Sequence, residues 1–132
     1  ILLGAKQYSC PVDVWSVGTI IPEMVTGHPL FPGDSEIDEL FKIFRCLGTP
    51  TEQMWDGVSQ LPDFKTDFPK WTPKDMRKTM PHPDRLDDHG LDLVRQCLKY
   101  TPNDRIIAKD ALTHPYFDSL DKSTVGTIPL PL

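Results

Sequence analysis

The chain has 132 residues, of which 39% are hydrophobic and 25% are charged, the composition of one domain that buries a core. Its 14 Lys and Arg against 19 Asp and Glu give a net charge of -5, so binding through nucleic-acid phosphates is not expected. Gly18, Pro22 and Glu23 interrupt the most apolar run, which excludes a membrane-spanning helix and any expected membrane partner.

The thiols and the first residues predict the compartment. Cys10, Cys46 and Cys97 are odd in number and widely spaced, which fits neither a disulfide framework nor a metal knuckle. Reduced, buried thiols of an intracellular protein are expected, with nucleus and cytoplasm both open. The start at Ile1 and the polar stretch after Gly4 do not read as a signal peptide.

The first predicted element is a helix over residues 11–25. Its apolar residues fall on every side of a helical wheel, the pattern of a core helix buried all round. Ser9 or Cys10 is expected to cap it, Pro11 suits its first turn, and Gly27 suits its end.

The second predicted helix starts at Ser35 and stops at Gly48, with carboxylates crowding its first turn. One apolar stripe runs along it, formed by Ile37, Leu40, Phe41, Phe44 and Leu47. This is the clearest helix in the chain.

Residues 49–88 are predicted to form a long irregular loop with short helical turns. The stretch holds six prolines, and apolar anchors pin it to the core: Met54, Trp55, Leu61, Phe64, Phe68 and Trp71. A loop of this length inside a compact domain is uncommon and often functional.

Two shorter helices are expected after this loop. One carries a stripe from Leu91 to Leu98 behind Asp88 as its cap, and the other covers residues 108–113 and ends at His114. No run alternates like a strand, so the predicted class is all-α with long loops.

No reaction centre is visible among the residues. The sequence has no glycine-rich phosphate loop, nucleophile elbow, paired metal ligands or Cys and His constellation. Each histidine is interpreted as structural: His28, His82, His89 and His114. No catalytic or metal-binding residue is therefore predicted.

Several motifs nevertheless carry a family resemblance. DVWSVG, with Asp13, Trp15, Ser16 and Gly18, resembles the motif that opens the central helix of the protein-kinase large lobe, and Arg105 in PNDRI resembles its distal arginine. Together with LFPGDSEIDELFKIFRCLGTP, FPKW and HPYF, they resemble the cyclin-dependent kinases from Ile1 to about Leu120.

The resemblance implies a fold and a place in it. The chain would be the all-α, C-terminal helical part of the large lobe, beginning just after the Ala-Pro-Glu motif. Residues 1–120 would belong to the catalytic domain, and residues 121–132 would be a flexible tail.

The resemblance also implies a function for the parent protein. That protein would be a cyclin-dependent serine/threonine kinase of the cell-cycle type, which uses ATP and Mg²⁺ and acts on protein substrates. Cyclin would bind mostly through regions outside this segment. Because no residue here corresponds to the parts that position phosphate, metal or acceptor hydroxyl, the segment needs no cofactor and should be inactive alone.

Four residues would support the catalytic loop by resemblance: Asp13, Trp15, Gly18 and Arg105. Asp13 would accept hydrogen bonds from the backbone of that loop, and Arg105 would pair with the glutamate of Ala-Pro-Glu. The alternative is that Asp13 is an ordinary first-turn carboxylate and Arg105 a surface residue.

A second set would dock a small Cks-type regulatory subunit by resemblance: Gly33, Asp34, Ser35, Glu36, Ile37 and Asp38. The same residues also make a good helix start, which is the alternative. The chain could accordingly be a truncated, non-catalytic interaction module that binds Cks-type subunits. Residues 65–78 carry a local excess of positive charge and are interpreted as a solvated loop.

Two residues depart from the family pattern. Pro22 stands inside the first helix, where it removes the hydrogen bond to the Gly18 carbonyl, and a kink near Gly18 is expected. Ile107 replaces the serine that usually caps the last helix, and losing such a cap costs about 1 kcal/mol.

Overall fold

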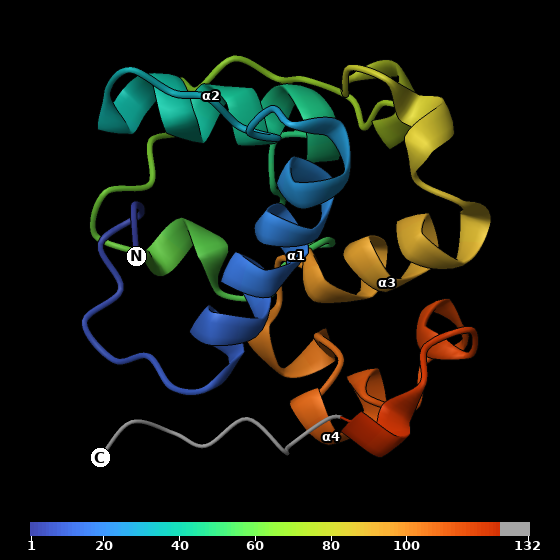
Figure 1. Ribbon diagram of the computed structural model, residues 1–132. Coiled ribbons are helices and arrows are strands. Elements are labelled where there is room, and N and C mark those ends of the chain that lie inside the picture. Colours follow the sequence, from blue (N-terminus) through green and yellow to red (C-terminus); the bar gives the residue numbers. More distant parts are fainter. Residues whose placement is uncertain (125–132) are drawn as a thin grey trace.

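The computed structural model describes residues 1–124, which form four α-helices joined by loops and 3-10 turns (Figure 1). The helices are α1 (Pro11–Thr26), α2 (Glu36–Leu47), α3 (Asp88–Cys97) and α4 (Ala108–Ala111). No β-strand occurs among the described residues, so the predicted all-α class is confirmed. Of the expected tail at residues 121–132, positions 125–132 lie outside the described residues.

Helix α1 occupies the span that its apolar pattern predicts. Pro11 is its first residue, and Gly27 ends it in the left-handed conformation at φ 78°, donating its N–H to the Glu23 carbonyl. The prediction of a side-chain cap is wrong, because Cys10 stands at the N-cap with helical dihedrals and makes no capping hydrogen bond. Pro22 lies inside a helix that continues to Thr26.

The prediction that α1 is buried all round is wrong for the described chain. Val17, Ile20 and Met24 are 47%, 49% and 80% exposed. The covered face instead carries Gly18 and Pro22 and packs beside α3, as Figure 1 shows. A helical wheel reports which residues are apolar, whereas the number of neighbouring elements decides how many faces are covered.

Helix α2 has the predicted boundaries. The Ser35 hydroxyl accepts the Asp38 N–H at 3.2 Å, and the Gly48 N–H reaches the Phe44 carbonyl at 2.8 Å. Phe44 is fully buried, whereas Ile37 at the start of the stripe is half exposed.

The segment between α2 and α3 is irregular, as predicted. Its regular parts are the 3-10 turns Val58–Gln60, Met76–Lys78 and Pro83–Arg85. Phe68 is its buried anchor, and its ring meets those of Phe41 and Phe44 edge-on at 5.9 and 5.7 Å between centroids. Aromatic packing therefore holds this segment against α2.

The start of α3 differs by one residue from the prediction. Asp87 is the N-cap and accepts the Gly90 N–H at 2.7 Å. Asp88 instead forms an ion pair with Arg77 at 2.7 Å, so its carboxylate is used elsewhere. Helix α4 is shorter than the predicted 108–113, and its N-cap Ile107 makes no side-chain capping hydrogen bond.

His114 is a structural residue, as interpreted. It is buried, its Nδ1 accepts the Tyr116 N–H at 3.0 Å, and its Nε2 lies 2.8 Å from the Asp92 carboxylate. The backbone hydrogen bond assigns the proton to Nε2, which donates to Asp92. No helix among the described residues has the length and apolar character that crossing a membrane requires.

Candidate functional site

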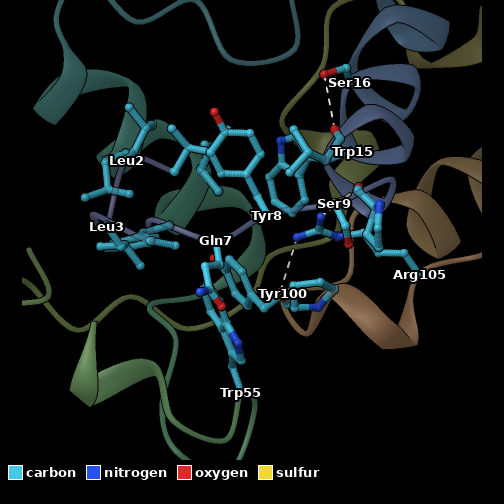
Figure 2. Close-up of a pocket in the computed structure, with 18 residues that line it drawn as sticks. Leu2, Leu3, Gln7, Tyr8, Ser9, Trp15, Ser16, Trp55, Tyr100 and Arg105 are labelled. Carbon is cyan, nitrogen blue, oxygen red and sulfur yellow. Dashed lines mark hydrogen bonds between the residues drawn. The ribbon is translucent and has the colours of Figure 1, made fainter. Parts of the chain in front are cut away.

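The principal cavity lies between the N-terminal segment and the helical core. It has a volume of about 360 Å³, and both chain-end residues such as Leu2 and core residues such as Phe44 line it. We call it the N-terminal cavity. Figure 2 shows that apolar side chains and the Arg105 guanidinium both reach it.

Three aromatic rings and one cation form a stack along this cavity. Trp55 lies parallel to Tyr100 at 6.0 Å between centroids, and Tyr100 stacks on Trp15 at 6.3 Å. The Arg105 guanidinium lies 5.0 Å from the centroid of the Trp15 ring (Figure 2). Side chains from three separate stretches of sequence, around Trp15, Trp55 and residues 100–105, thus share one wall.

Tyr100 is a structural member of this stack. Its hydroxyl donates to the Gly48 carbonyl at 2.5 Å, beyond the end of α2. Burial raises the pKa of Tyr100 far above its usual value, with a smaller contribution from Cys46. The phenol therefore stays neutral and is not equipped to act as a general acid or base near neutral pH.

Arg105 is the most constrained cation of the site. Its Nε donates to the Lys99 carbonyl at 2.8 Å, its Nη1 to the Pro11 carbonyl at 2.8 Å and its Nη2 to the Tyr100 carbonyl at 3.3 Å. Partial burial lowers its pKa. Arg105 is partly exposed and is held by these backbone carbonyls, and its pairing with a glutamate stays a prediction.

The charge around Arg105 is unbalanced within the described residues. No carboxylate of residues 1–124 forms an ion pair with its guanidinium. The Ile1 amino group also lies nearby, and its pKa is lowered first by burial and then by the charge of Arg105. A guanidinium without an ion-pair partner beside a partly apolar cavity is suited to bind a carboxylate.

The four residues expected to support a catalytic loop occupy different places. Trp15 and Arg105 are in direct contact, and Gly18, one turn further along α1, packs against Cys97 and Leu98. Asp13 is exposed in the first turn of α1. Asp13 and Arg105 both line a second cavity of about 280 Å³ but form no ion pair with each other. The role of Asp13 at a catalytic loop stays a prediction.

The turn before α2 is held by its own side chains. The Gly33 N–H donates to Glu39 Oε2 at 2.8 Å, and the Asp34 N–H donates to Asp38 Oδ2 at 3.1 Å. A Cβ at Gly33 would lie 2.5 Å from the Glu39 Cα, so only glycine fits there.

Asp38 is engaged inside this turn. Lys42 Nζ lies 2.8 Å from its Oδ2, and the hydrogen bonds from Lys42 and then from the Asp34 backbone lower the pKa of Asp38. Glu36 and Ile37 are exposed, as are the three residues before them, so the turn is open to a partner. Binding of a partner at this turn stays a prediction.

Sequence reasoning missed Tyr100 and Trp55 as parts of the site. Trp55 was expected only as an anchor of the loop, and Tyr100 only as a residue closing a helix. The available signal was their size and aromatic character, which does not reveal a partner 45 or more positions away.

Among residues 1–124, no group of three or more His, Cys, Asp or Glu side chains is placed to hold a metal ion. The candidate site consists of an aromatic stack and the Arg105 guanidinium. The family model described as protein kinase domain matches residues 1–117.

Proposed function

The chain belongs to the protein kinase domain family, and we propose that it is the C-terminal helical part of the large lobe of a cyclin-dependent serine/threonine kinase. The parent enzyme would transfer phosphate from ATP, with Mg²⁺, to serine or threonine of protein substrates during the cell cycle. Cyclin would bind it mostly through upstream regions, in the nucleus, the cytoplasm or both. Residues 1–132 would supply support rather than chemistry.

The observation that carries this proposal is the environment of Arg105. Three backbone carbonyls orient its guanidinium, and no carboxylate of residues 1–124 forms an ion pair with it. Such a site favours an acidic residue, and the glutamate of an Ala-Pro-Glu motif directly before Ile1 would supply it. Leaving a buried charge without its partner costs about 3–5 kcal/mol, and less for a half-exposed one.

The exposed face of α1 supports the same proposal. Val17, Ile20 and Met24 follow one another at spacings of three and four residues, so they share one side of the helix. An apolar helix face of this kind suits packing under another part of the domain. In the proposed kinase, it would carry the catalytic loop.

The experiment compares the 132-residue chain with a version extended by the kinase sequence that precedes Ile1. Each is incubated with cyclin, labelled ATP, Mg²⁺ and a protein substrate. We expect label transfer only from the extended chain, and an Arg105→Ala variant of it should lose thermal stability. Phosphate transfer by the 132-residue chain alone would refute the proposal.

A second candidate function is docking of a Cks-type regulatory subunit at Gly33–Asp38. The supporting observation is that this turn is rigidly capped, whereas Glu36 and Ile37 stay exposed.

In a pull-down with a Cks-type subunit, Glu36→Ala and Ile37→Ala should each lose the signal. Matched controls are Glu23→Ala and Ile107→Ala, which alter exposed residues of the same type elsewhere. Equal retention by all four variants would rule out this docking site.

A further inference from the structure

Three basic side chains gather at the C-terminal end of α2. The Arg45 guanidinium lies 5.2 Å from the centroid of the Trp71 ring. The segment that carries Trp71 is bound to the end of α2, because Thr49 N–H donates to the Trp71 carbonyl and Lys74 N–H donates to the Cys46 carbonyl. Lys74 is thereby fixed beside the last turn of the helix.

Arg95 of α3 joins the same surface. The charges of Arg95 and Lys74 both act on the buried Cys46 thiol, where they oppose the rise in pKa that burial causes. The Arg95 guanidinium also approaches the carboxylate of Asp75, the residue next to Lys74, so both cations lie on the same part of the surface. We call Arg45, Lys74 and Arg95, together with the Trp71 ring, the basic strip.

The positive charge of the basic strip is poorly compensated. The Arg95 guanidinium lies 3.8 Å from the Asp75 carboxylate, the single ion pair made by any of the three cations within residues 1–124. Arg45, Lys74 and Arg95 are all exposed. Asp92 of α3 also senses the charge of Arg95, so three cations face two neighbouring carboxylates and keep an excess positive charge on a chain whose net charge is -5.

We propose that the basic strip binds a short acidic peptide segment of a partner protein. The three cations come from α2, α3 and the loop between them, so their backbone positions are set by the fold before a ligand arrives. Trp71 is partly exposed and adds an aromatic surface beside Arg45. This binding goes beyond the proposed kinase function, since it needs neither nucleotide nor catalytic loop.

The surroundings favour a short peptide over a long polyanion. The opposite end of α2 carries Glu36, Asp38 and Glu39 in its first turn. A helix of 12 residues is roughly 18 Å long, so a nucleic acid or an anionic bilayer lying across the strip would approach these carboxylates. A peptide of a few residues can contact the strip alone.

The test is fluorescence anisotropy at low salt with a labelled peptide of alternating glutamate and glycine. Its glutamine counterpart is the uncharged control. Lys74→Glu should weaken binding about tenfold, because an attraction becomes a repulsion. Lys65→Glu changes the net charge equally on the same loop but outside the strip, and it should leave the Kd within about twofold. Arg95→Gln, as a second variant, should also weaken binding.

Four results would overturn the proposal. If Lys65→Glu and Lys74→Glu weaken peptide binding equally, only the net charge of the chain affects binding, and not the basic strip. Binding of the glutamine peptide with a similar Kd would show that charge does not drive the binding. No binding of the acidic peptide to a chain that circular dichroism shows to be folded would show that the basic strip is not a binding site. Tighter binding of an oligouridine RNA than of the acidic peptide would assign the strip to nucleic acid.

Discussion

Replacing Gly18 by alanine is expected to destabilise the protein, although alanine is the better helix former by about 1 kcal/mol. Gly18 lies where α1 passes α3 most closely. An added Cβ would lie 2.6 Å from the Cys97 Cβ, and 2.9 and 3.0 Å from the Cδ2 and Cγ of Leu98. The Cys97 Cβ is attached to the backbone and cannot rotate away.

The expected magnitude follows from these distances. Carbon atoms pack best at about 3.5–4.0 Å, so the two helices must separate by about 1 Å. Overpacking of this kind costs about 1–3 kcal/mol. Subtracting the gain in helix propensity leaves a net loss of about 1 kcal/mol in the free energy of unfolding.

The assay is urea unfolding followed by tryptophan fluorescence, with the midpoint and slope compared between variants. Adding Cys97→Gly removes the closest clashing atom, so a double-mutant cycle should show favourable coupling between the two substitutions. A midpoint for Gly18→Ala at or above that of the parent chain would refute the reasoning. It would mean that α1 and α3 can move apart without a loss of stability.

Three further predictions concern other elements. Pro22→Ala should raise the melting temperature by about 2–4 °C, because the regained backbone hydrogen bond stabilises the helix more than the loss of packing from the fully buried ring destabilises it. A calorimetric scan that shows no rise in the melting temperature would mean that the helix tolerates Pro22. Ser35→Ala should lower the unfolding free energy by about 1 kcal/mol in urea titration, since the Asp38 N–H loses its acceptor. The hydrogen bond from His114, with that from Gln96, lowers the pKa of Asp92. This stabilisation is complete above the unfolded-state pKa of about 3.9 and is lost as pH falls through the lowered folded value, so Asp92→Asn should show a shallower acid loss of stability. If the unfolding free energy of the variant falls with decreasing pH as steeply as that of the parent chain, the stabilising role of the Asp92 carboxylate is refuted.

The interpretation of α1 shows where reasoning from sequence stops. Its apolar pattern predicts the span correctly, because backbone hydrogen bonds join residues four apart. The same pattern wrongly predicts burial of Val17, Ile20 and Met24, because burial depends on which other elements are present. The position of the α3 cap also shifted by one residue, since Asp87 and Asp88 are equally able to cap and the ion pair with Arg77 decides between them.

The sequence by itself determined the span of α1 and the ends of α2, because Ser35 and Gly48 act on backbone atoms only a few residues away. It also marked Arg105 as distinctive through a motif. Only the tertiary structure placed Arg105 on the Pro11 carbonyl, 94 positions earlier, and joined Trp15, Trp55 and Tyr100 in one stack. Such contacts depend on how the whole chain packs, since no local hydrogen bond or periodicity specifies a neighbour so distant in sequence.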